Sequence, residues 1–309
     1  MKNQSALNWL IPLIAILAAI TASIGLFSTN GDGPFQFTTL HNETIAIYGR
    51  GLYRFDTPLI AIGYRISDAF TLFAGIPLLL ISFWMVRRNS VRGKILLTGT
   101  LLFFLYNFGS LALGAAYNNL LLIYIVLTMA TFLSVIRLLL SFDLQTFPAL
   151  FSENLSRRGI SIFFIVSGIA LFCIWLFLSI VPALLANGVP AKLASYTTVI
   201  TFVVDMGIIA PILVSAGVLF KRGEPLGYVL APVLIIFIDV LGCSLLVMGI
   251  AQQIAGLMNI GQFIGFVVSF AILTFFSPGF TVLLFRNISD ASSLQTSNSQ
   301  FSELNRKEV

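Results

Sequence analysis

The sequence contains few charged residues, one histidine and two cysteines, and each shortage excludes a class of protein. Charged residues make up 9% of the 309 residues, whereas about 25% of a soluble domain is charged. A single histidine, His41, cannot supply a bis-histidine haem or a histidine-rich metal site. Cys173 and Cys243 lie in separate apolar runs without a CxxC pair, which excludes dithiol chemistry and predicts buried structural cysteines. We therefore expect no cofactor and no metal centre.

Catalytic signatures are also missing. The chain has no HExxH, GxSxG or P-loop pattern, and we assign no catalytic residue. Two aspartates in consecutive apolar runs resemble the intramembrane aspartyl proteases. However, the second lies in "FIDVLG" where that family has GxGD, and the "PAL" at 182–184 precedes both aspartates instead of following them. An intramembrane enzyme is therefore the weakest of the functions considered.

Apolar sequence is abundant, with 58% hydrophobic residues and 29 phenylalanines. Runs of about 18 or more apolar residues recur, and each predicts a transmembrane helix within a lipid bilayer. The predicted fold class is all-α, a polytopic bundle of eight transmembrane helices at about 9–27, 68–86, 95–116, 120–140, 159–184, 197–220, 227–251 and 260–285. The first run resembles a signal peptide but is long for one, so we expect it to be retained, with cleavage after Ser23 as the alternative.

The basic residues predict the orientation. Thirteen of the 17 Lys and Arg residues fall on one side of the predicted spans. Because Lys and Arg concentrate in cytoplasmic loops, both termini are expected in the cytoplasm. The same distribution explains the net charge of +5, and the absence of a basic stripe or reader motif argues against nucleic acid as a partner.

The longest outer loop, about 28–67, alternates apolar and polar residues around the polar "HNET" turn, which predicts a small extracytoplasmic β-hairpin. Charged residues at the mouth of the bundle could select anions, or could pair with one another to fix the loop, which is the commoner outcome; they are Arg54, Asp56, Arg65 and Asp68. The transmembrane domain is predicted to end at 286, and the Ser- and Asn-rich tail at 287–309 is predicted to be disordered.

Two aspartates, Asp205 and Asp239, lie within predicted spans. A charged residue at a helix centre costs about 2.5–3.5 kcal/mol on insertion scales, so neither is expected to face lipid. Further polar residues occupy the outer ends of these and neighbouring spans, and the candidate ligands among them are Asn107, Ser110, Thr201 and Gln262. We therefore predict an outward-opening polar vestibule with both aspartates at its floor. The alternative is that each aspartate only forms hydrogen bonds across a helix contact.

A shift of 134 residues aligns Pro77 with Pro211, Arg87 with Lys221 and Gly93 with Gly227. This pattern suggests two four-helix parallel repeats, although apolar helices also align by chance. The prolines are expected to kink their helices.

Several segments carry a resemblance to a known family, among them "YGRGLYRFDT" and "DMGIIAPILVSAGVLFKRGEPLGYVLAPVL". They resemble a family of uncharacterised polytopic membrane proteins of prokaryotes, with its motifs at 51–54 and at Asp205, Gly207 and Pro211. The similarity covers most of the chain except its two ends. It implies a shared architecture and the cell (plasma) membrane of a bacterium, and it transfers no catalytic residue.

The leading functional prediction is an integral membrane protein that binds or moves a small solute or cation from the outer side. The first alternative is a structural or sensory membrane protein whose outer loop binds a partner protein.

Overall fold

Long apolar helices dominate the structure. The computed structural model describes residues 2–190 and 193–289. In this part of the chain, eight helices are long and apolar enough to cross a membrane. Their bounds are Ser5–Phe27, Pro58–Arg87, Val91–Gly114, Leu121–Leu139, Arg157–Leu185, Ile200–Arg222, Pro225–Ile254 and Ile260–Arg286. The predicted helical bundle is therefore confirmed for the described residues, and its eight apolar helices are compatible with a multi-pass membrane protein.

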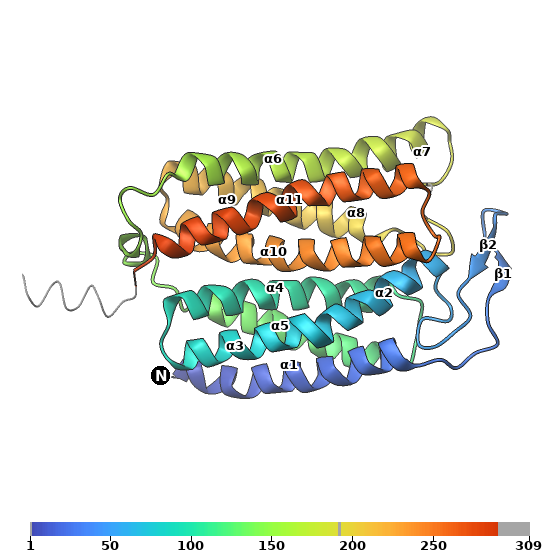
Figure 1. Ribbon diagram of the computed structural model, residues 1–309, viewed down its shortest axis with the longest axis horizontal. Helices are drawn as coiled ribbons and strands as arrows, with labels where there is room; N and C mark the ends of the chain where they lie inside the picture. The colour runs from blue at the N-terminus through green and yellow to red at the C-terminus, as the bar shows by residue number, and fades with distance from the viewer. Residues whose placement is uncertain (1, 191–192, 290–309) are drawn as a thin grey trace, which may run out of the picture.

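The helices run side by side along the long axis of the molecule (Figure 1). The first spans contain α1 (Lys2–Phe27), α2 (Pro58–Phe70), α3 (Ile76–Arg87), α4 (Val91–Gly114) and α5 (Leu121–Leu139). The later spans contain α6 (Arg157–Trp175), α7 (Val181–Leu185), α8 (Ile200–Val204), α9 (Ala210–Arg222), α10 (Pro225–Ile254) and α11 (Ile260–Arg286). We call these sets the first and second halves. A short 3₁₀ helix, η2 (Phe147–Leu150), lies in the connection between them.

The two halves meet where α4 packs against α10. These helices carry the largest numbers of buried residues among the described helices. Gly99 of α4 permits the close approach, because a Cβ atom there would lie 2.6 Å from the Cβ atom of Ile236. A side chain at this position would force the helices apart.

The predicted hairpin is confirmed by two short antiparallel strands, β1 (Phe35–Thr38) and β2 (Thr44–Ile47). Phe35 pairs with Ile47, and Thr38 pairs with Thr44. The hairpin lies at the end of the bundle opposite the N-terminus, and we call this the hairpin end (Figure 1).

The second span begins ten residues before the predicted start at 68, because its helix starts at Pro58. Proline is well suited to the first turn of a helix, where its missing N–H has no helical acceptor to serve. The polar residues between 58 and 68 lowered the hydropathy of the segment. In the structure they are partly or fully buried, and Arg65 donates to the Tyr48 hydroxyl in the loop and to the Leu26 carbonyl in α1.

Three spans contain a π-turn directly before an Xaa-Pro pair. These are η1 (Thr71–Gly75) before Pro77, η3 (Leu176–Ile180) before Pro182 and η4 (Asp205–Ile209) before Pro211. Proline lacks the N–H and clashes with the carbonyl four residues earlier, and a π-turn widens the helix at that point. The bounds of η1 and η4 differ by 134 residues, the offset that aligns the prolines.

The start of the predicted tail is tied to a loop. The Ser152 N–H donates to the carbonyl of Asn287, and the Ser289 N–H donates to the carbonyl of Leu150. The rest of the predicted disordered segment, 290–309, lies outside the described residues.

Candidate functional site

Asp205 is the first residue of η4 and is buried, with 7% of its surface exposed. Its Oδ1 accepts a hydrogen bond of 3.0 Å from the Tyr106 hydroxyl on α4. Its Oδ2 accepts one of 2.9 Å from the Trp175 indole Nε1 at the end of α6. The carboxylate therefore joins three spans and crosses from the second half to the first.

Both partners of Asp205 are neutral donors held by aromatic packing. The Trp175 ring lies 5.3 Å from the ring of Phe202, and the Tyr106 ring lies 6.1 Å from that of Phe237. Buried Trp and Tyr side chains need a hydrogen-bond partner for their polar ends. The Asp205 carboxylate supplies an acceptor to each of them, but neither of the two brings a positive charge.

A related contact occurs at the next residue of α4, which points about 100° away from Tyr106. Asn107 is buried, and its Nδ2 donates to the Thr71 hydroxyl, the first residue of η1, over 3.3 Å. The Ser67 hydroxyl donates to Asn107 Oδ1 over 2.7 Å. Two consecutive residues of α4 thus bond to the first residues of two π-turns, one in each half.

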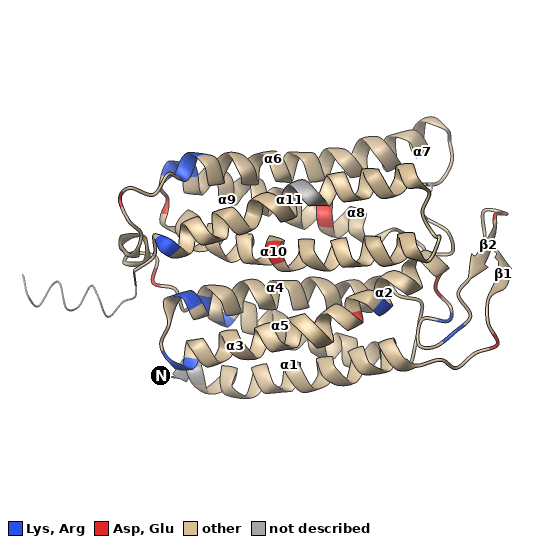
Figure 2. Cartoon of the chain, viewed as in Figure 1, with Lys and Arg blue, Asp and Glu red and all other residues tan. Residues whose placement is uncertain are grey.

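Asp239 lies on α10 and faces a different helix. The Thr281 hydroxyl of α11 donates to Asp239 Oδ2 over 2.5 Å. Asp239 Oδ1 is buried and has no hydrogen-bond partner in the described part of the chain. Figure 2 shows acidic residues in the middle of the bundle, near the labels α8 and α10, far from the charged ends of the helices.

The structure does not bring the two predicted carboxylates into a shared contact among the described residues. Phe237, which packs against Tyr106, is two residues from Asp239, and two residues on a helix differ by about 200° in direction. Asp239 therefore points away from the Tyr106–Asp205 contact. The single vestibule floor predicted from the sequence is replaced by two separate carboxylate environments.

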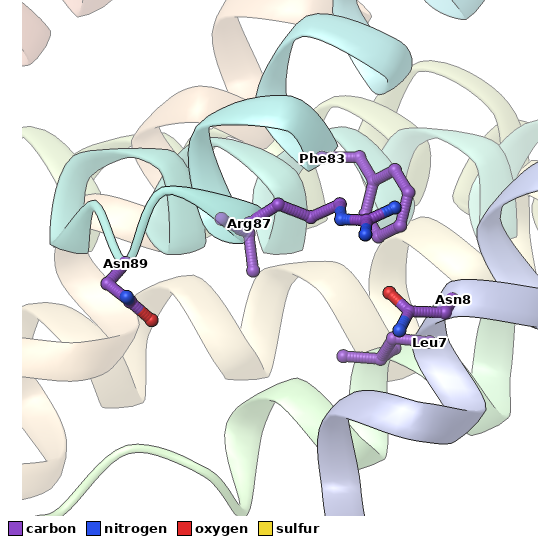
Figure 3. A pocket seen from close by; sticks show the side chains of 6 residues that line it. Leu7, Asn8, Phe83, Arg87 and Asn89 are labelled. Carbon is purple, nitrogen blue, oxygen red and sulfur yellow. The ribbon is translucent and has the colours of Figure 1, made fainter. Parts of the chain in front are cut away.

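Two surface cavities lie away from both aspartates. One of about 240 Å³ separates the start of α1 from the end of α3, with Leu7 and Asn8 across from Phe83 and Arg87 (Figure 3). The other, of about 400 Å³, is lined by residues of the 148–157 connection and by Tyr228. Neither is lined by Asp205 or Asp239, so neither is the predicted vestibule.

The remaining predicted ligands in the spans lie apart from the aspartates. Ser110 and Thr201 are half-buried and, within the described residues, bond to neither carboxylate. Gln262 is exposed and completes a capping box at the start of α11. Its Oε1 accepts from the Asn259 N–H over 3.0 Å, while its own N–H donates to Asn259 Oδ1 over 2.8 Å.

The charged residues predicted at the mouth mainly hold the loop in place. Arg65 donates to the Tyr48 hydroxyl over 2.6 Å and to the Leu26 carbonyl over 2.9 Å. Arg54 is exposed, and its guanidinium lies 4.8 Å from the ring centroid of Phe55. These contacts fix the loop, but they are made with neutral groups and not, as the loop-fixing alternative expects, with Asp56 and Asp68.

Asp56 connects the loop to both halves. Its Oδ1 accepts from the Ala116 N–H over 2.9 Å and from the Tyr196 hydroxyl over 2.8 Å. Burial raises the pKa of this carboxyl, while the two hydrogen bonds act in the opposite direction. Burial beside Asp56 also raises the pKa of the Tyr196 hydroxyl.

Asp68 forms a buried contact at the hairpin end. The Tyr53 hydroxyl donates to Asp68 Oδ2 over 2.7 Å. Gly25 of α1 makes room for this pair, because a Cβ atom there would overlap Asp68 Oδ2 at 1.9 Å. The pair packs the outer loop onto α1 and α2.

The aromatic partners of the aspartates, Tyr106, Trp175 and Tyr53, are not among the site residues predicted from the sequence. A usable signal was present, since each carries a polar atom that must find an acceptor when buried. Because the spans contain few polar residues, the aspartate carboxylates are the strongest hydrogen-bond acceptors that these side chains could reach.

Comparison with known proteins found no matching family model, no similar curated protein and no similar solved structure.

Proposed function

We propose that this protein moves a small solute across the cell membrane together with a proton, and that Asp205 carries the proton. The observation on which this proposal rests is a buried carboxylate whose two oxygens both accept from neutral donors. A charge in an apolar medium is costly unless it is paired. Uptake of a proton removes that charge without moving any side chain out of the site.

The two donors differ in what they allow. An indole N–H only donates, whereas a phenolic hydroxyl donates or accepts. A proton on Asp205 Oδ1 can be donated to the Tyr106 oxygen once the Tyr106 O–H turns away, while Trp175 continues to donate to Oδ2. We therefore assign the transferred proton to Oδ1, and its arrival breaks the Tyr106 O–H···Oδ1 bond and forms an Oδ1–H···O bond.

The position of this bond couples it to helix movement. Asp205 is the first residue of the π-turn η4 in the second half, and its partner Tyr106 lies on α4 in the first half. π-turns and proline breaks recur where helices change shape in function. We propose that the halves are parallel repeats offset by 134 residues, and that they rock against each other as Asp205 changes its charge.

The orientation completes the proposal. Lys and Arg gather at the end of the bundle where α1 begins (Figure 2), and positive residues favour the cytoplasmic side. We therefore propose that both termini lie in the cytoplasm and the hairpin outside. The resemblance to prokaryotic membrane proteins supports the cell membrane as the location.

Reconstituted liposomes test the transport proposal. An imposed pH gradient is followed with a pH-sensitive dye trapped inside, in the presence and absence of a panel of small solutes. We expect at least one solute to accelerate gradient decay, and Asp205→Asn to abolish that effect while Asp205→Glu retains part of it. Asp143→Asn, which changes an exposed loop carboxylate, is the matched control. Equal solute-dependent decay in Asp205→Asn would contradict the proposal.

A second candidate function rests on the hairpin. Leu40 at its tip is 100% exposed, and Phe35 and Phe37 on β1 are exposed beside it. Exposed apolar groups of this kind are typical of interaction sites. If the loop binds a partner protein, a photo-crosslinker at 40 should trap a defined adduct in cells, and one at the exposed Asn89, at the opposite end, should not. The absence of any adduct at 40 would exclude this function.

A further inference from the structure

The contact between α10 and α11 contains buried oxygens without partners. Asp239 Oδ1 makes no hydrogen bond within the described residues, and neither does the hydroxyl of Ser277, a residue with 0% exposure. The Ser277 hydroxyl lies beside the Asp239 carboxylate, close enough to act on it electrostatically but without good hydrogen-bond geometry. An unpaired buried polar group costs about 1–3 kcal/mol, so two of them side by side indicate a missing ligand.

The surrounding residues form a stripe on α11 that faces α10. Thr274, Ser277 and Thr281 are spaced three and four residues apart, which places them on one helical face. Thr281 bonds to Asp239, and Gly242 lies against Thr274, since a Cβ atom there would be 2.5 Å from Thr274 Oγ1. The stripe therefore faces the turn of α10 that runs from Asp239 to Gly242.

Proline adds an oxygen to the same stripe. Pro278 lies inside α11 and has no N–H, so the Thr274 carbonyl, four residues earlier, lacks its helical donor. Backbone carbonyls without a helical donor coordinate Na⁺ in the unwound helices of membrane transporters, and the Thr274 carbonyl is a ligand of the same kind.

We propose that Asp239, Ser277, Thr281 and the Thr274 carbonyl form a binding site for a monovalent alkali cation, with Na⁺ as its probe. All four groups offer hard oxygen atoms. One carboxylate neutralises one monovalent charge, which a site in the bilayer requires. A divalent ion would leave an excess positive charge and usually takes several carboxylates. The site is separate from Asp205, and its existence does not depend on transport.

Ser277→Ala is the informative variant. It removes a candidate ligand whose hydroxyl has no well-aligned hydrogen-bond partner among the described residues, so the cation-free fold should keep most of its stability. Ser161→Ala is the matched control, because Ser161 is also 0% exposed with an unpaired hydroxyl but lies on α6. A purely structural stripe would make the two variants behave alike.

The thermal unfolding midpoint of the full chain in detergent is measured against NaCl concentration, with N-methyl-D-glucamine chloride holding the ionic strength constant. A ligand that binds the folded state raises the midpoint in a concentration-dependent way. We expect a saturable rise with Na⁺, a shift of about tenfold or more to higher Na⁺ in Ser277→Ala, and no shift in Ser161→Ala. Asp239→Asn should remove the response.

No response of the wild-type chain to Na⁺ would overturn the proposal, and so would an unshifted response in Ser277→Ala. If Asp239→Asn fails to fold, the two serine variants still decide the question. Because the assay measures binding at equilibrium, a failure of solute-driven flux would leave this result unaffected.

Discussion

Replacing Tyr106 with phenylalanine tests whether Asp205 is charged in the folded protein. The change deletes one hydroxyl and with it the 3.0 Å hydrogen bond to Asp205 Oδ1. A hydrogen bond to a charged group is worth about 1.5–3 kcal/mol and one between neutral groups about 0.5–1.5 kcal/mol. In transmembrane helices the measured average is lower, about 0.6 kcal/mol.

The expected cost therefore depends on the protonation state. With Asp205 ionised at alkaline pH, Tyr106→Phe should lower the unfolding free energy by about 1.5–3 kcal/mol. At acidic pH, or with Asn at 205, the lost bond is neutral and the cost should fall to about 1 kcal/mol or less. The difference between these two costs, about 1 kcal/mol, is the coupling free energy between positions 106 and 205.

A double-mutant cycle measures this coupling. The unfolding free energies of Tyr106→Phe, Asp205→Asn and the double variant are obtained by reversible unfolding in mixed micelles at both pH values. Tyr117→Phe, at an exposed tyrosine near the end of α4, is the control and should have no effect. If Tyr106→Phe costs the same with Asp and with Asn at 205 at alkaline pH, Asp205 does not carry the charge assigned to it.

Two further predictions concern stability. Gly25→Ala should destabilise the protein by about 1–3 kcal/mol in thermal unfolding, because the new Cβ atom would overlap Asp68 Oδ2. Gly265→Ala is the control and should be neutral or stabilising, since a Cβ atom there would have no neighbour within 4 Å. Equal effects of the two variants would contradict the close packing at Gly25. Burial raises the pKa of Asp56 in the folded protein above its ordinary value of 3.8. The contribution of Asp56 to the stability of the folded state is therefore greatest below pH 3.8, and it falls as the pH rises through the folded-state pKa of Asp56. In Asp56→Asn, which has no carboxyl group at this position, the unfolding free energy should therefore decrease less as the pH is raised. Asp143, whose pKa is lowered by the Thr146 hydroxyl and the Gln145 N–H, should show the opposite sign, with stability lost as pH falls. Profiles that change in the same direction in both Asn variants would refute this assignment.

The number and type of helices could be predicted from the sequence because bilayer thickness alone demands long apolar runs. The hairpin could be predicted because a polar turn between alternating strands has few other solutions. The predicted start of the second span was wrong because a hydropathy scale treats every arginine as a solvent-exposed charge. In the structure, the Arg65 guanidinium is hydrogen-bonded to the Tyr48 hydroxyl and the Leu26 carbonyl.

The arrangement of the site could not be predicted in the same way. Helical periodicity shows which residues share one face, but it does not show which neighbouring helix that face meets. The π-turn at 205–209 adds a further complication, since one extra residue rotates everything after it by about 100°. The sequence therefore identified Asp205 and Asp239 as candidates, but it could not predict that Tyr106 and Trp175 bond to Asp205 and Thr281 to Asp239.

The fluorescence of Trp175 tests the central claim most directly, because its indole N–H bonds to Asp205. The chain has three tryptophans, and replacing Trp9 and Trp84 with Phe leaves Trp175 as the only reporter. We predict a reversible pH titration of its emission that disappears in Asp205→Asn and persists in Asp239→Asn. An unchanged titration in Asp205→Asn would show that Trp175 senses another group, and Asp205 would then not be the site of proton uptake.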